Sequence, residues 1–323
     1  MDRDSGLLAS DSRTVSLDLL KVVMALMVVG LHANFMREHS ETVWWYSVKG
    51  LFRIAVPVFL VSNGYFFAMK SPTGDWRWLR RIVYFYIVWT AIYAPVWLPT
   101  NRSVSRLAML LTFGWFHLWY LAGLIGATFC LLLLRRLGTR FLVAAMVGCL
   151  FAGVALQYGA FETSHSSLVG RVLRWNSSHR NFLLFSFPFF TAGYLIQKHE
   201  LGTRFGTAAS GTICLVGLLL LFVEAHAVHA LTGGEGDVDN LLSLGLLAPA
   251  VFLTAMKVPL ERCWGKQVSR LANGIYFTHP IFLVGLGFER LLAPTLATAA
   301  TAAASIALTA MIMAFPPLSK RLL

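Results

Sequence analysis

Charged residues are scarce in this chain of 323 residues. They make up 13% of it, whereas ordinary soluble domains carry about 25%. Hydrophobic residues reach 57%, and the mean hydropathy is +0.66. This composition argues against a soluble enzyme with a single anchor and predicts an all-α, polytopic membrane protein.

Cysteine is also rare. Four cysteines stand far apart and form no C-x-x-C pair, so we expect free packing thiols rather than a disulfide or metal site. The sequence contains no Walker loop, dinucleotide fingerprint, H-E-x-x-H or G-x-S-x-G motif. We therefore expect neither a metal site nor nucleotide hydrolysis. The cysteines are Cys130, Cys149, Cys214 and Cys263.

Acidic residues are fewer than basic ones. The chain has 15 aspartates and glutamates against 27 lysines and arginines, which gives a formal net charge of +12 at pH 7. In a soluble protein this excess would suggest nucleic acid as a partner. In a chain this apolar, it is explained by the positive-inside rule and by sites for an anionic ligand. We expect a lipid bilayer as partner and no nucleic acid, and the sequence leaves the oligomeric state open.

Apolar segments of spanning length alternate with charged or Pro/Gly-rich breaks, which predicts about ten transmembrane helices. The polar residues 1–15 are expected to be a short N-terminal segment, followed by a membrane helix rather than a cleaved signal peptide. Residues 104–115 are shorter and suit a re-entrant or interfacial piece. The expected spans are 16–36, 51–69, 81–98, 116–134, 141–158, 182–197, 208–228, 240–256, 271–289 and 296–315.

Lysine and arginine are distributed unevenly between the two sides that these spans define. With the N-terminus in the cytoplasm, seventeen fall on the cytoplasmic side and nine outside, and Lys21 lies within the membrane. The positive-inside rule therefore predicts that both termini are cytoplasmic. The outer loop with Glu235, Asp237 and Asp239 lacks Lys and Arg, and we expect these three acids to be solvated.

The first span carries the polar groups Asp18, Lys21 and His32 inside an apolar run. Ionisable groups at membrane depth tend to face a cavity or a partner and mark a functional site. The eleven residues from Lys21 to His32 rise roughly 16 Å in about three helical turns, which brings both to nearly the same face. The pattern predicts a pocket wall with a cation at one end and a proton acceptor deeper in.

Five motifs resemble those of the acyltransferase 3 family, membrane proteins that acylate cell-surface sugars. They are Asp18-x-x-Lys21 with His32, then Phe52-Arg53-Ile54-Ala55-Val56-Pro57-Val58-Phe59 running into Ser62-Asn63-Gly64-Tyr65, then His117-Leu118-Trp119-Tyr120-Leu121, then Phe187-Pro188-Phe189-Phe190 with Gly193-Tyr194, and last Ser269 with Gly274-Ile275-Tyr276 and His279-Pro280. They occur in the family's order and cover residues 18–280. Each motif alone is weak, and together they are a strong match.

The resemblance implies a single membrane acyltransferase domain over residues 1–323, in the inner membrane of a bacterium. It implies an O-acyltransferase that moves an acyl group, which we expect to be acetyl, from acyl-CoA to a hydroxyl of a cell-surface or lipid-linked saccharide. Acetyl-CoA would be a donor substrate, and no permanently bound cofactor is expected. The sequence departs from the family at Lys21, where the family carries arginine, and Arg and Lys are not equivalent at forked contacts.

The resemblance places the catalytic histidine at His32. The alternative for a lone membrane histidine is a helix-to-helix contact, but an imidazole with a pKa near neutrality suits a general base for a sugar hydroxyl. Asp18 and Lys21 are neighbours on the helix. They form either a structural ion pair or a catalytic pair in which Lys21 meets the donor and Asp18 orients it.

Donor and acceptor contacts are expected from the other motifs. Arg77, Arg80 and Arg81 either serve topology or bind the phosphates of coenzyme A. The expected substrate-binding residues are Arg53, Ser62, Asn63, Tyr65, His117, Trp119, Tyr120, Tyr276 and His279. Each has a structural alternative: helix contacts for the second span, an interfacial aromatic belt for 117–120, and a proline kink beside His279.

The outer loop 159–181 gathers positive charge. It is either a solvated face or a site for an anionic glycan or a lipid-linked sugar diphosphate. The residues concerned are His165, Arg171, Arg174, His179 and Arg180.

Two further classes of function compete with the enzyme. A transporter or flippase for a glycan precursor would also have ten helices and membrane charges, but transporters tend to show inverted repeats, and none is evident. A sensing module with a degenerate site has only Lys21 in its favour. Thioester turnover would separate these classes.

Overall fold

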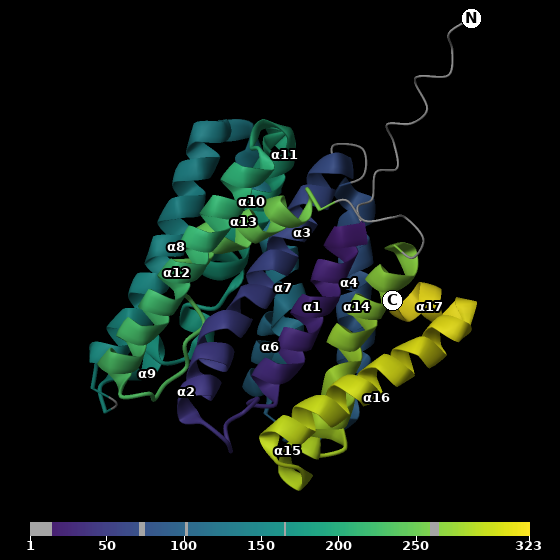
Figure 1. The fold of residues 1–323 in the computed structure, drawn as a ribbon. Coiled ribbons are helices and arrows are strands. Elements are labelled where there is room, and N and C mark those ends of the chain that lie inside the picture. The colour runs from purple at the N-terminus through teal and green to yellow at the C-terminus, as the bar shows by residue number, and fades with distance from the viewer. Residues whose placement is uncertain (1–14, 71–74, 101–102, 165, 259–264) are drawn as a thin grey trace, which may run out of the picture.

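The structure is a computed structural model, and it describes residues 15–70, 75–100, 103–164, 166–258 and 265–323 (Figure 1). Every regular element in these ranges is helical. The expected all-α class is therefore confirmed for the part of the chain that the structure describes. The predictions that concern residues 1–14, Arg102, His165 and Cys263 lie outside it.

The main helices are α1 (Val15–His32), α3 (Ala55–Lys70), α4 (Asp75–Ile92), α7 (Trp119–Leu134), α8 (Thr139–Glu162), α10 (Phe187–Lys198), α12 (Thr207–Thr232), α13 (Leu244–Ala255), α14 (Gly265–Pro280) and α16 (Pro294–Ala314). Shorter helices connect them: α2 (Glu41–Trp44), α5 (Ala94–Trp97), α6 (Val104–Phe113), α9 (Leu168–Leu173), α11 (Leu201–Arg204), α15 (Phe288–Leu291) and α17 (Pro316–Leu322). Three π-helical turns, at Trp45–Gly50, Phe182–Ser186 and Ile281–Gly285, and several 3₁₀ turns join or extend these elements.

Six stretches of the described chain are long and apolar enough to cross a bilayer: Val15–His32, Glu41–Lys70, Phe116–Leu137, Thr139–Glu162, Thr207–Thr232 and Pro294–Ala314. The other four expected spans coincide with α4, α10, α13 and α14. Three of these are shorter than 18 residues, and α4 begins with Asp75, Arg77, Arg80 and Arg81. The expected piece at 104–115 is α6, which buries no residue.

The bundle has two ends, which Figure 1 separates clearly. The upper end holds the start of α1, the end of α3, the start of α4, α11 and the start of α14. The lower end holds the end of α1, α2, α9 and α15, together with the loop from α12 to α13. Because α1, α3 and α14 run between the ends, residues of one helix reach both.

Helices α3 and α10 pack backbone against backbone at two glycines. A Cβ at Gly64 would overlap the carbonyl oxygen of Phe190, and a Cβ at Gly193 would overlap that of Val61. Membrane helices approach this closely only where small residues line the contact. The pair therefore fixes α3 at the centre of the bundle.

On the other side of the core, α1 packs against α14 and α14 against α16. The Ala/Thr-rich α16 turns Thr301, Ser305 and Thr309 inward, and a Cβ at Gly274 of α14 would overlap Thr309. This is the small-residue packing that the composition of 297–310 predicts. The described cysteines, Cys130, Cys149 and Cys214, are free thiols, as expected.

Candidate active site

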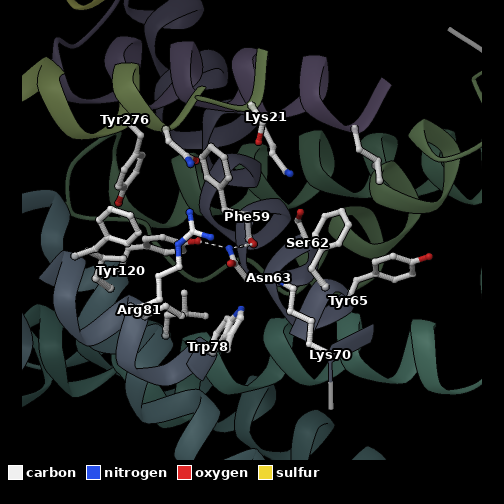
Figure 2. A pocket seen from close by; sticks show the side chains of 18 of the residues that line it. Lys21, Phe59, Ser62, Asn63, Tyr65, Lys70, Trp78, Arg81, Tyr120 and Tyr276 are labelled. Carbon is white, nitrogen blue, oxygen red and sulfur yellow. Dashed lines mark hydrogen bonds between the residues drawn. The ribbon is translucent and has the colours of Figure 1, made fainter. Parts of the chain in front are cut away.

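A cavity of about 550 Å³ opens between α1, α3, α4, α7 and α14 (Figure 2). Its volume lies in the usual range for small-molecule sites, roughly 300–1,000 Å³. Among the described residues that line it, none is acidic. Seven of the predicted site residues line it: Lys21, Ser62, Asn63, Tyr65, Arg81, Tyr120 and Tyr276.

Three cations from three helices stand along the upper part of the cavity. Lys21 comes from α1, Lys70 from the last turn of α3 and Arg81 from the second turn of α4. The ammonium nitrogen of Lys21 lies 3.3 Å from an oxygen of the buried Asp18 and 4.8 Å from the centre of the Phe66 ring. The expected Asp18–Lys21 pair is therefore confirmed, and it holds the lysine at the cavity wall.

The inner part of the cavity is lined by hydrogen-bonded polar groups. The Asn63 amide donates to the Tyr120 hydroxyl at 2.6 Å and to the carbonyl of Phe59 at 2.8 Å (Figure 2). Tyr276 donates its hydroxyl to the carbonyl of His117 at 2.8 Å. Helix α3 thus brings Phe59, Asn63 and the neighbouring Ser62 to the same cavity as Tyr276.

Three histidines gather beyond Tyr276. The rings of His32 and His279 stack with centroids 5.4 Å apart and planes 18° apart, and His117 lies 5.2 Å from His279. Nδ1 of His279 donates to the carbonyl of Tyr276 at 2.7 Å, and a carbonyl can only accept, so this nitrogen carries the proton. The rings of His279 and His32 thus lie face to face, and the role of His279 in binding substrate stays a prediction.

Phe116 helps to hold the histidine group. Its ring centroid lies 4.3 Å from that of His32, and its backbone has φ +48°, which is rare for a bulky residue. Such strained residues persist where the surrounding structure determines them, often at functional sites. His32 itself is half-buried and accepts or donates no hydrogen bond within the described residues.

His32 does not line the cavity. The Tyr276 ring lies between the two groups, with its centroid 5.4 Å from Tyr120 on the cavity side and 5.4 Å from His117 on the other. His117 and Tyr120 are almost completely buried. The alternative of an aromatic belt at the membrane surface therefore fails for these two residues.

A second polar group, the lower polar cluster, consists of Arg53, Arg180, Asp239, His179 and Gln157. The Asp239 carboxylate pairs with the guanidinium of Arg53 and, at 3.2 Å, with that of Arg180. Asp239 is 6% exposed, so the expectation that it is solvated was wrong, whereas Glu235 and Asp237 are exposed as expected. Two arginines far away in sequence draw this loop residue inward.

Backbone contacts fix the carboxylate of the cluster. The Gln157 side-chain oxygen accepts from the backbone N–H of Asp239 and of Asn240, each at 2.8 Å, and its amide donates to the carbonyl of Asn240 at 2.8 Å. Burial alone would raise the pKa of Asp239, but the charges of Arg180 and Arg53 outweigh it and hold the pKa well below its usual range. The carboxylate is therefore ionised.

The remaining predicted residues lie apart from the cavity. Arg77, Arg80 and Arg81 are all exposed on α4, and Arg81 is the one of the three that also lines the cavity; the role of the group stays a prediction. Trp119 is half-buried, and the guanidinium carbon of Arg180 lies 4.8 Å from the centre of its ring. In the outer loop Arg171 is exposed, and Arg174 donates to the carbonyl of Thr163 at 2.6 Å.

Sequence reasoning missed several residues of the cavity. Lys70 was assigned to topology, and neither Trp78 nor Asn273 was considered. Helical spacing contains a signal for Asn273, because it stands three residues before Tyr276 and therefore shares its face. No local signal marks Asp239, whose partners are supplied by distant segments.

Comparison with known proteins identifies the family. The chain matches the family model described as the acyltransferase domain over residues 14–314. It therefore belongs to the acyltransferase 3 family. Together with the six apolar helices, this membership indicates an integral membrane domain of the acyltransferase type.

Two curated relatives are similar at low identity. An amino-acid racemase of Enterococcus faecalis is 22% identical over 84% of this chain, and a serine/alanine racemase of Enterococcus gallinarum is 25% identical over 84% of it. The matched region is 41% of the length of each relative. No solved structure matches the chain.

Proposed function

We propose that the protein is an O-acyltransferase that moves an acyl group, acetyl in the first instance, from acyl-CoA to a hydroxyl of a cell-surface or lipid-linked saccharide. The observation that carries this proposal is the cavity itself. It is lined by Lys21, Lys70 and Arg81 and by no acid among the described residues, and Tyr276 on its wall contacts His117 of the histidine group. A polyanionic donor with a long, narrow arm suits this arrangement.

The upper part of the cavity suits the phosphates of coenzyme A. Arginine binds phosphate oxygens through two parallel hydrogen bonds, and lysine binds them as a point charge. Lys21 can fulfil the second role, so the family's arginine is not required at this position. The aromatic rings of Phe66 and Trp78 add flat apolar surface between the cations, against which an adenine ring can stack.

The chemistry needs one base and one route for a proton. The saccharide oxygen attacks the thioester carbonyl, and His32 takes the hydroxyl proton as the new C–O bond forms. The C–S bond then breaks, and the proton passes from His32 to the CoA sulfur. An imidazole is suited to both steps because it exchanges a proton near neutral pH.

Tyr276 lies on the path between the donor cavity and His32. Because its ring lines the cavity and contacts His117 and His279 of the histidine group, the acyl group reaches His32 only when this side chain turns away or when the acyl group passes beside it. The donor therefore approaches from the upper end and the acceptor from the lower end, with the histidines between them.

We also propose that the chain crosses the inner membrane of a bacterium ten times as a single membrane domain, with both termini and the upper end in the cytoplasm. In this arrangement α4, α10, α13 and α14 join the six apolar helices. Their position inside the bundle supports it, since α10 packs on α3 and α14 on α1. Protein around a short or polar helix can form hydrogen bonds with its polar groups, which lipid cannot do.

The first test is the release of free thiol from acetyl-CoA by the purified protein in nanodiscs, with a native membrane glycan extract as acceptor. We expect release that depends on the acceptor and falls by about 10²–10⁴-fold in His32→Ala, the usual contribution of a general base. The matched control is His39→Ala, an exposed histidine at the same end of the bundle.

Two results would contradict the proposal. Equal release by the wild type and His32→Ala would remove His32 from the chemistry. No release with acetyl-CoA or longer acyl-CoA donors, from protein that is folded and binds CoA, would favour a transporter.

A further inference from the structure

The lower polar cluster holds more positive than negative charge. Two guanidinium groups share the single carboxylate of Asp239. His179 lies beside them, 3% exposed, and burial lowers its pKa, so its ring is neutral at pH 7. The two guanidinium groups thus carry more charge than the carboxylate they share, and Arg53 holds its part of that charge largely away from water.

Uncompensated buried charge is unfavourable, because removing an ion from water costs several kcal/mol unless a partner replaces the lost hydration. Arg53 has unused hydrogen-bonding capacity. Its side chain is 10% exposed, and its Nε is buried without a hydrogen-bond partner among the described residues. Arg180 is 24% exposed and opens the cluster to the surface of the lower end.

The cluster is also close to the histidine group. Gly30, two residues before His32, is in tight contact with the Phe52 ring, and Phe52 is the neighbour of Arg53. On the other side, Arg180 lies over Trp119, two residues after His117. An anion held here would therefore be near His32, at the end of the bundle opposite the donor cavity.

We propose that Arg53 and Arg180 form an anion-binding site for the acceptor, which recognises a phosphate or carboxylate group on the saccharide. Asp239 acts as a resident counter-ion that holds the two guanidinium groups in place and competes with the ligand. This inference rests on the proposed function, because it assigns the acceptor end of the same reaction.

Competition between Asp239 and the ligand predicts the direction in which a change at Asp239 alters anion binding. If the arginines only stabilise the fold, replacing Asp239 weakens whatever the cluster does. If Asp239 competes with a ligand anion, Asp239→Asn keeps the shape of the side chain and the bond from the backbone N–H to Gln157, removes the competing charge, and tightens anion binding. Both arginines then have their charge available to the ligand.

The test is isothermal titration of the full chain in neutral nanodiscs, with saturating CoA to occupy the donor cavity. Pyrophosphate represents a lipid-linked sugar diphosphate, glucuronate represents an acidic sugar, and glucose is the neutral comparison. We expect at least one of the two anions to bind saturably, with one anion bound per chain. We expect no binding of glucose. The anion that binds identifies the source of the charge.

The arginine variants and the Asp239 variant should change the Kd for the anion in opposite directions. Arg53→Gln and Arg180→Gln should each raise the Kd roughly tenfold or more, as loss of a charged hydrogen bond does. Asp239→Asn should lower it severalfold. Arg171→Gln, an exposed arginine of the neighbouring α9, should leave it unchanged. Because Arg180 is the more exposed member, its variant serves if Arg53→Gln does not fold.

Absence of saturable binding by both anions would overturn the proposal, as would equal binding of glucose or weaker binding in Asp239→Asn. An equal loss in Arg171→Gln would show that the effect comes from general surface charge, and it would also overturn it. CoA binding to the same samples is measured separately. Failure of the acceptor site is thereby distinguished from failure of the donor cavity and of the proposed function.

Discussion

The two ends of this bundle use positive charge in different ways. At the upper end, Lys21, Lys70 and Arg81 line a cavity in which no described residue is acidic. At the lower end, Arg53 and Arg180 are closed on the buried carboxylate of Asp239. Positive charge at the upper end thus lines a cavity, whereas the arginines of the lower end share a carboxylate of the chain itself.

The difference follows from where the acids lie in the sequence. The acid that pairs with Lys21 is Asp18, which stands on the same helix, so this ion pair is local to one wall of the cavity. Asp239 instead stands on a loop, which can fold inward between two segments. A local acid positions one cation, while a distant acid joins two.

The sharpest way to break this comparison is to damage both ends together. Helix α3 extends from just after Arg53 to Lys70, and Gly193 of α10 lies against its middle. Gly193→Val would insert a branched side chain where even a Cβ overlaps the carbonyl of Val61. Overpacking typically costs about 1–3 kcal/mol and more against rigid backbone, so we expect loss of the monodisperse folded protein in size-exclusion chromatography.

The control for this variant is Gly211→Val. Gly211 also lies in a long helix, α12, but a Cβ there meets nothing within 4 Å. We expect this variant to elute and melt close to the wild type. Normal yield and melting temperature for Gly193→Val would show that α3 and α10 are not held by this contact.

A smaller change should affect the upper end alone. Lys21→Gln removes the charge at the cavity wall, and loss of a hydrogen bond to a charged group costs about 1.5–3 kcal/mol. We expect the Kd for CoA in isothermal titration to rise by about 10- to 100-fold, while anion binding at the lower end stays unchanged. Lys21→Arg should retain most of the affinity, because the charge persists.

Arg77→Gln is the matched control, since Arg77 is exposed on α4 outside the cavity. If Arg77→Gln weakens CoA binding as much as Lys21→Gln, the donor recognises general surface charge rather than the cavity. The upper end would then not be a specific cationic site that can be compared with the lower polar cluster.

The sequence predicted the upper end better than the lower end. The positions Lys21, Ser62, Asn63, Tyr65 and Tyr276 come from motifs within single helices, where spacing determines which face a residue occupies. The cavity accordingly gathers them. Hydrophobic runs likewise predicted an all-helical fold, although α10, α13 and α14 are too short or too polar to be recognised as spans by themselves.

The lower cluster escaped prediction because its contacts join distant segments. Arg53 and Asp239 are 186 residues apart, and Arg180 and Asp239 are 59 apart. A loop rich in acid and glycine has the composition of a solvated turn, and only the folded chain reveals that Gln157 binds its backbone. The same limit applies to His32. Its motif marked it as a candidate catalytic residue but did not reveal that Tyr276 lies between it and the cavity.

The smallest expected effect concerns the stability of the lower end in acid. Burial lowers the pKa of His179, so the folded state holds this imidazole neutral below the pH at which the unfolded chain, with a pKa of about 6.5, takes up a proton. The unfolded state therefore binds more protons as the pH falls below about 6.5, and stability decreases through that window. At pH 5.5 this single group should contribute a loss of about 1 kcal/mol relative to pH 7.5.

His179→Gln removes the titration and keeps a polar side chain of similar size. We expect the apparent melting temperature of the wild type in neutral nanodiscs to fall by about 2 °C more than that of the variant between pH 7.5 and 5.5. Asp239 does not contribute to this window, because its carboxylate is ionised in both states until the pH approaches the unfolded value of about 3.9. Parallel pH profiles for the wild type and His179→Gln would mean that water or an anion reaches His179, and the lower end would then be as open as the upper one.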